Sequence, residues 1–188
     1  MDRRNWLGVL ASTPLAGLAG SWMMRPAFAK GEKAVEELQK NWKILLAEGA
    51  EVASGTEPLK LSDAEWKKRL APVAYDVLRH EGTERAGSSP LDREKRPGVF
   101  VCAGCGLPLF TSAMKFDSGT GWPSFFTTIP GAFGTSRDFK LILPRTEYHC
   151  SRCGGHHGHL FDDGPEPTGL RYCNNGVALR FIPKTGKT

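Results

Sequence analysis

Two Cys-x-x-Cys pairs constrain the fold of this chain more than any other feature of its sequence. Cys102 and Cys105 form one pair, Cys150 and Cys153 form the other, and a glycine directly follows each pair. Two thiolates at this spacing can bind one tetrahedral metal ion if the chain turns tightly between them. A glycine after the second thiolate supplies the positive φ that such a turn requires. The sequence therefore predicts one zinc ion bound by all four cysteines, which would join two distant hairpins.

Disulfide bonds are the alternative use of these cysteines, because a chain exported to an oxidising compartment can form them. Pairing within one Cys-x-x-Cys would close a small, strained loop, whereas the doubled, glycine-flanked pattern is typical of zinc. We therefore favour zinc. Four thiolate ligands leave no open coordination position, so the ion would stabilise the fold and take no part in catalysis.

Cys173 is the fifth cysteine and belongs to neither pair. An unpaired cysteine is a candidate reactive thiol, although a free cysteine is more often a small buried core residue. A thiol attacks as the thiolate, and a neighbouring cation such as Arg171 would lower its pKa. The sequence thus offers one candidate nucleophile.

Three histidines, His156, His157 and His159, lie within four residues of one another. On an extended strand His157 and His159 would share one face, but a bulge or turn at Gly158 could bring His156 and His159 together. Asp163 in the following turn could orient one of them, as a third group orients the base in thiol enzymes. Purely structural histidines and further metal ligands are the alternatives, and spacing alone does not decide between them.

Residues 1–29 have the three parts of a secretory signal. They contain an arginine pair at positions 3 and 4, an uncharged stretch to Met24 and a small-x-small site ending at Ala29. The arginine pair before an aromatic-apolar pair matches the twin-arginine form. We predict recognition by the twin-arginine export machinery, cleavage near Ala29 and a periplasmic or otherwise exported protein. A membrane anchor formed by an uncleaved leader is the alternative, because the stretch from Trp6 to Met24 is long enough to span a bilayer.

An amphipathic helical extension is predicted for residues 30–61. Apolar side chains recur there at three- and four-residue spacing, and the helical pattern runs to about Ala53. Ser62 and Glu65 form a capping box that begins a second helix. Pro72 should end or kink that helix, and a further short helix is expected over residues 74–80.

Residues 62–184 are expected to form the main domain. From Gly98 onward, short apolar runs alternate with turn residues, and strands are predicted at 99–102, 139–143, 157–161 and 177–182. No helix long enough for a parallel crossover follows any of these runs, so the domain should be mainly β and antiparallel. The net charge of +5 falls to +3 without the predicted signal segment, which is too small and too evenly mixed with acidic residues to indicate nucleic-acid binding.

Three long segments of the chain resemble the signature blocks of the B-type methionine sulfoxide reductases. These segments are residues 115–125, 158–165 and 169–175, and residues 62–84 resemble the usual lead-in to them. The similarity covers about residues 62–183, and three long motifs in the same order are specific. It implies two small antiparallel β-sheets with peripheral N-terminal helices. It also implies reduction of methionine-R-sulfoxide through a sulfenic acid on the catalytic cysteine, with protein-bound methionine sulfoxide as the expected substrate and the free amino acid as a further candidate.

The resemblance also implies a role for each matching residue. Cys173 would be the nucleophile, with Arg171 and Asn175 as its flanking groups. Trp122 would receive the methyl group of the substrate. The family's polar pocket corresponds to His156, His159 and Asp163, and its zinc ligands correspond to Cys102, Cys105, Cys150 and Cys153.

The chain departs from many family members at Thr120, where a second, resolving cysteine is common. No cysteine remains for that role, so the resemblance implies an external thiol or a thioredoxin-like protein as reductant. We expect a monomer that repairs oxidised methionine in exported proteins. A non-enzymatic zinc-ribbon binding module and a thioredoxin-like dithiol oxidoreductase are the competing classes.

Overall fold

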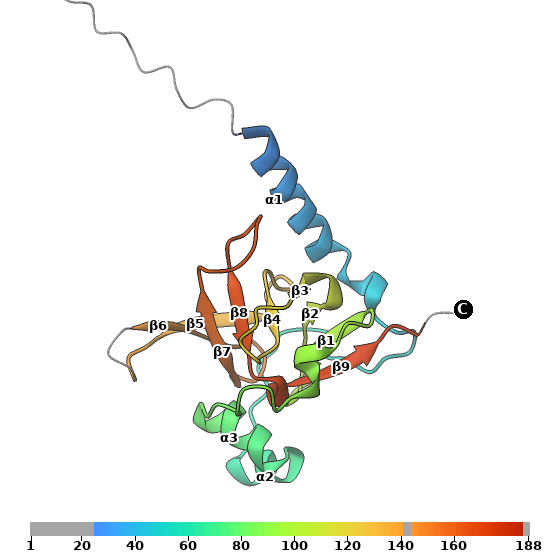
Figure 1. The fold of residues 1–188 in the computed structure, drawn as a ribbon. Helices are drawn as coiled ribbons and strands as arrows, with labels where there is room; N and C mark the ends of the chain where they lie inside the picture. Colours follow the sequence, from blue (N-terminus) through green and yellow to red (C-terminus); the bar gives the residue numbers. More distant parts are fainter. Residues whose placement is uncertain (1–24, 141–143, 186–188) are drawn as a thin grey trace, which may run out of the picture.

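A computed structural model describes residues 25–140 and 144–185 of the chain (Figure 1). Most of the predicted signal segment, residues 1–24, lies outside the described residues, so its role stays a prediction. Within the described ranges, none of the helices has the length and apolarity needed to cross a membrane.

The described strands form two antiparallel sheets, which confirms the predicted mainly β class. The three-stranded sheet has the order β2-β1-β9 and the six-stranded sheet has the order β3-β4-β8-β7-β6-β5, with every pairing antiparallel. The strands of the first sheet are β1 (Gly98–Cys102), β2 (Pro108–Thr111) and β9 (Leu179–Pro183). Those of the second are β3 (Lys115–Phe116), β4 (Ser124–Phe125), β5 (Phe133–Asp138), β6 (Arg145–Cys150), β7 (His156–Phe161) and β8 (Arg171–Asn174).

The strand predicted at residues 139–143 is wrong for its described part. β5 ends at Asp138, Phe139 has no regular secondary structure and Lys140 lies at a bend, while residues 141–143 lie outside the described residues. The Asp138 carboxylate accepts a hydrogen bond from the Lys140 backbone N–H at 2.8 Å, which favours a turn. The strand predicted at residues 177–182 also begins late, because Gly176–Ala178 form a short 3-10 turn.

The helices lie at the ends of the β body (Figure 1). α1 (Arg25–Lys40) is followed by a 3-10 turn at Trp42–Leu45, and α2 (Asp63–Arg69) and α3 (Pro72–His80) lie at the opposite end. The helical pattern predicted to run to about Ala53 is wrong beyond Leu45, because the 3-10 turn ends there and Leu46 adopts an extended conformation with φ −80° and ψ 135°. The Ser62/Glu65 capping box is confirmed. α2 ends before Pro72, which begins α3 at a position where its missing N–H has no helical partner to lose.

Aromatic side chains between the two sheets form the core. Phe110 of β2 stacks on Phe125 of β4 with ring centroids 3.9 Å apart, and Phe100 of β1 meets Phe125 edge to face at 5.1 Å. All three rings are completely buried. Because β4 pairs with β8, this packing fixes the strand that carries Cys173.

The segment after α1 crosses the body of the protein as an extended strap, residues 46–61. The Ala53 N–H donates to the Gly106 carbonyl at 2.9 Å, and the Leu59 N–H donates to the Arg152 carbonyl at 2.7 Å. The Arg152 guanidinium in turn donates to the Gly55 carbonyl at 3.1 Å. The strap therefore holds the turns of both Cys-x-x-Cys pairs.

Candidate active site and zinc site

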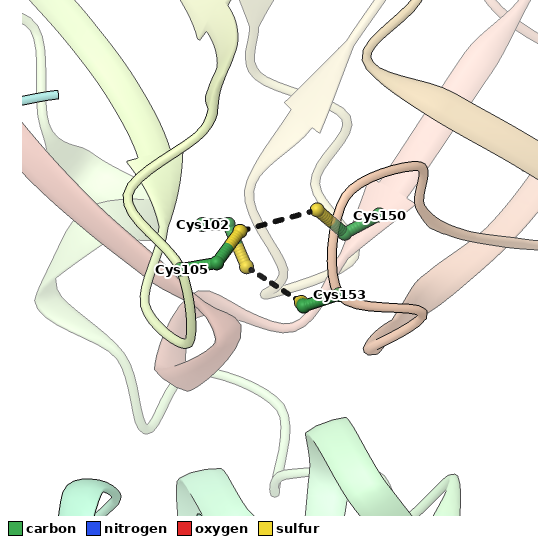
Figure 2. A group of neighbouring side chains, drawn as sticks. All are labelled: Cys102, Cys105, Cys150 and Cys153. Carbon is green, nitrogen blue, oxygen red and sulfur yellow. Dashed lines mark hydrogen bonds between the residues drawn. The ribbon is translucent and has the colours of Figure 1, made fainter. Parts of the chain in front are cut away.

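The four paired cysteines lie together at the junction of the two sheets (Figure 2). Cys102 ends β1 and Cys150 ends β6, and each begins a tight turn that brings its partner cysteine back toward it. Gly106 and Gly154 have φ values of +75° and +66°, and their N–H groups donate to the Cys102 and Cys150 carbonyls, each at 2.8 Å. The glycines thus close the two turns as the sequence predicts.

The sulfur positions fit one zinc ion and exclude disulfides. All four Sγ atoms lie within 4.8 Å of one another, and the sulfur atoms of Cys102 and Cys153 are 3.7 Å apart. A tetrahedron with Zn–S bonds of ~2.3 Å has sulfur atoms ~3.8 Å apart, whereas a disulfide requires ~2.0 Å. The four residues are buried and provide only thiolates. They form a structural zinc site, which links a hairpin of one sheet to a hairpin of the other.

Cys173 lies in the middle of the six-stranded sheet. It is directly opposite Ser124 of β4 on one side and His159 of β7 on the other. Its side chain lines a cavity, whose other described walls are Thr83, Trp122, Arg145, Gly158, His159, Phe161, Asn174 and Asn175. The remaining thiol, an aromatic ring and a histidine therefore share one cavity.

Burial and charge act on the Cys173 thiol in opposite directions. Burial raises its pKa above the ordinary value, while the Arg171 guanidinium and the Thr120 hydroxyl lower it without fully compensating. Asp163 accepts two hydrogen bonds of 2.7 Å from Arg171, and its negative charge also raises the pKa of the thiol. Arg171 thus acts in the expected direction, but burial has the larger effect.

Asp163 is not placed to orient a histidine, contrary to the sequence expectation. Its hydrogen bonds go to Arg171, and its side chain is 60% exposed, whereas that of Arg171 is 10% exposed. The Arg171 guanidinium also lies over the Phe161 ring, 4.3 Å from its centroid. Asp163 therefore holds the arginine that stands next to the nucleophile.

A β-bulge in β7 determines which of the three histidines lie on the same face of the sheet. Tyr148 pairs with Gly158, while the next residue of β6 pairs with His156, so His157 is the extra residue. The bulge brings the rings of His156 and His159 to 5.4 Å, as the sequence allowed. Glycine is required beside it, because a Cβ at Gly158 would lie 1.9 Å from the Cys173 carbonyl oxygen.

The three histidines have different surroundings. His157 is fully buried against aromatic rings, and this burial lowers its pKa to about 4, so it is a neutral core residue. His159 lines the Cys173 cavity, and its Nε2 is hydrogen-bonded to Asp138 Oδ2 at 2.7 Å. His156 lines a separate cavity, where its Nδ1 is hydrogen-bonded to Glu147 Oε1 at 2.7 Å. His159 is therefore the histidine that faces the nucleophile.

The side chains of Asn175 and Trp122 are both hydrogen-bonded to the backbone of Glu84. The Asn175 amide donates to the His157 carbonyl at 3.0 Å and accepts the Glu84 N–H at 3.0 Å. The Trp122 indole N–H donates to the Glu84 carbonyl at 3.1 Å. The buried Glu84 carboxylate accepts hydrogen bonds from two N–H groups of the turn after Asn175, and burial raises its pKa. Glu84 therefore fixes two walls of the cavity relative to each other.

Three polar residues of the site region were missed by the sequence analysis. Asp138, Arg145 and Glu147 come from β5 and β6, and they meet the histidines only across the sheet. No motif joins them to the histidines in the sequence. Both strands carry consecutive polar residues without an apolar alternation, so no signal in the sequence indicated these contacts.

Comparison with known proteins agrees with this geometry. Residues 70–183 match the SelR domain family. Peptide methionine sulfoxide reductase MsrB of Agrobacterium fabrum is 50% identical over 123 residues, which are 65% of this chain and 91% of that protein. The Methanosarcina barkeri MsrB is 52% identical over 121 residues, covering 64% and 85%. Peptide methionine sulfoxide reductase B1, chloroplastic, of Arabidopsis thaliana is 49% identical over 130 residues, covering 69% and 64%.

A β fold with a four-thiolate zinc site and one further thiol in a cavity defines a zinc-stabilised thiol enzyme. The chain belongs to the SelR family, the B-type peptide methionine sulfoxide reductases. It is an oxidoreductase that acts as a peptide-methionine (R)-S-oxide reductase.

Proposed function

We propose that the chain repairs oxidised methionine in exported proteins through a sulfenic acid formed on Cys173. One observation carries the proposal: among the five cysteines, only Cys173 lies outside the zinc site, and it shares a cavity with His159 and Trp122. The Trp122 ring provides an apolar wall for the substrate methyl group. Cys173 provides the nucleophile, and His159 provides a proton.

The reaction is a two-electron exchange between two sulfur atoms. The Cys173 thiolate attacks the sulfoxide sulfur while His159 protonates the sulfoxide oxygen, because that oxygen is a poor leaving group until it is protonated. The oxygen ends on Cys173 as a sulfenic acid, and the methionine thioether leaves. Two external thiols then return Cys173 to the thiol and release a disulfide and water.

The absence of a resolving cysteine requires this external reductant. Thr120 stands close enough for its hydroxyl to lower the pKa of the Cys173 thiol. A cysteine at position 120 would therefore be within reach of the Cys173 sulfenic acid. The wild-type chain has no such group, so a small thiol or a thioredoxin-like protein must enter the cavity.

Mass spectrometry after substoichiometric substrate tests this cycle. We expect dimedone to trap a sulfenic acid on Cys173 in the wild type, because no neighbouring thiol consumes it. Thr120→Cys should instead yield a disulfide between positions 120 and 173 and lose most of the dimedone adduct. Thr120→Ser is the matched control and should behave as the wild type. A wild-type disulfide between Cys173 and any zinc ligand would contradict the proposal.

Export by the twin-arginine machinery is the second part of the proposed function. The arginine pair, the uncharged stretch and the small-x-small site support it. Since this route carries folded proteins, zinc would bind before export and would protect the four thiolates from the oxidising compartment. The repaired substrates would then be other exported proteins.

Expression of the full chain in a bacterium that has twin-arginine export tests the location. We expect a mature protein that begins near Lys30 in the periplasmic fraction, as read by N-terminal sequencing. Replacing Arg3 and Arg4 together by lysine should leave most of the precursor unprocessed in the cytoplasm. Replacement of Arg25 by lysine is the matched control. Processing that is insensitive to the arginine pair would contradict this route.

A further inference from the structure

His159 is held by an acidic side chain that belongs to no sequence motif. Asp138 ends β5, and its Oδ2 accepts hydrogen bonds of 2.7 Å from both His159 Nε2 and the Arg145 guanidinium. Its Oδ1 accepts the Lys140 N–H at 2.8 Å. The Asp138 and His159 side chains are only 8% and 13% exposed. Asp138 is therefore fixed by three donors and is largely shielded from water.

This contact determines which nitrogen of His159 can serve the substrate. A carboxylate only accepts hydrogen bonds, so Nε2 carries a proton in both charge states of the ring. Nδ1 is then the nitrogen that gains and loses the proton during catalysis. His159 is directly opposite Cys173 in the β7–β8 register and lines the same cavity. The transferable proton is thus assigned to the nitrogen that Asp138 does not occupy.

We propose that Asp138 is a positioning residue that fixes the tautomer of His159 and stabilises its imidazolium form for proton delivery to the sulfoxide oxygen. The inference rests on the proposed function, because it assumes that His159 is the acid. Asp138 does not line the Cys173 cavity, so it would act through the histidine to which it is hydrogen-bonded. It corresponds to the third group that orients an acid or base in other thiol enzymes.

Charged groups on four strands surround the His159 ring. Burial lowers the pKa of His159, Asp138 from β5 raises it, and Arg145 from β6 and His156 from β7 lower it. Glu147 of β6 is directly opposite His159 in the sheet and is bonded to His156, while Cys173 faces His159 from β8. Asp138 is the group of these that favours the protonated ring through a direct hydrogen bond. Its removal should shift the balance toward the neutral ring.

Asp138→Asn tests the proposal, because it keeps the size of the side chain and removes its charge. We expect His159 to titrate at a lower pH by NMR, so that the imidazolium is lost earlier as the pH rises. The basic limb of the kcat–pH profile should move down in pH in parallel. At neutral pH, kcat should fall by about ten- to a hundredfold, within the range that a positioned general acid supplies. KM should change little, and Asp138→Glu should restore part of kcat.

A double-mutant cycle separates this role from a merely structural one. If Asp138 acts through His159, Asp138→Asn should cause little further loss in a His159→Asn background. Glu147→Gln is the matched control: it removes the carboxylate that is hydrogen-bonded to the other histidine, and it should leave the His159 titration close to that of the wild type. Zinc content and melting temperature report on folding in every variant.

Two results would overturn the inference. One is an unchanged His159 titration in Asp138→Asn, and the other is an equal loss of kcat with and without His159. Inactivity of the wild-type chain toward methionine-R-sulfoxide would instead contradict the proposed function. The NMR titration needs no turnover, so the two failures are distinguishable.

Discussion

Replacement of Cys173 by serine is expected to abolish reduction of methionine-R-sulfoxide, with a loss on the order of 10⁴-fold or more. A serine hydroxyl is a far weaker nucleophile than a thiolate, and it cannot accept the oxygen as a sulfenic acid. Cys173 is the only cysteine outside the zinc site, so no other thiol of the chain can replace it. The measurement is an assay of each sulfoxide epimer with dithiothreitol as reductant.

The control for this variant is its metal content. Cys173 is not among the clustered cysteines, so Cys173→Ser should bind one zinc ion and melt at the wild-type temperature. Loss of activity with intact zinc would place the defect in the chemistry. Retained reduction of the R epimer would refute the assignment of Cys173 as nucleophile.

Loss of the zinc ion is expected to unfold the chain. The site joins the β1–β2 turn to the β6–β7 turn, and its four side chains are buried in the hydrophobic core. Structural zinc contributes about 10–16 kcal/mol of apparent binding free energy in small zinc domains. That is comparable to the whole free energy of unfolding of an ordinary domain, about 5–15 kcal/mol. Removing a single ligand therefore has consequences far beyond the site.

Cys105→Ser provides the test, with Cys173→Ser as the matched control. We expect Cys105→Ser to lose zinc, to be poorly soluble and to show no cooperative thermal transition by circular dichroism. A strong chelator should produce the same state from the wild type as the temperature is raised. Cooperative melting of a zinc-free chain at the wild-type temperature would show that the metal does not stabilise the fold.

Local chemistry could be predicted from the sequence because it depends on neighbouring residues. The Ser62 capping box, the glycine-closed cysteine turns and the histidine bulge all follow from spacing within a few residues. The zinc site also follows, because a metal brings distant pairs together by a fixed geometry. The zinc site and the local geometry around it could therefore be predicted from the sequence.

Contacts across the sheet could not be predicted, because strand register is set by the packing of the whole domain. Asp138 lies far from His159 in the sequence, and only the order β7-β6-β5 brings them together. The direction of the pKa shift of the Cys173 thiol could not be predicted for the same reason. Arg171 is visible in the sequence, but the burial that outweighs it depends on the folded sheet.

The strap formed by residues 46–61 has a consequence for the metal. It precedes the region that matches the SelR domain, yet its backbone is hydrogen-bonded to the turns of both cysteine pairs at Gly106 and Arg152. Strap docking and zinc binding therefore stabilise the same conformation of the two turns, and such a coupling is reciprocal. Zinc binding should favour docking of the strap by the same factor by which the docked strap favours zinc binding. Detachment of the strap from the two turns would therefore indicate that zinc has been lost.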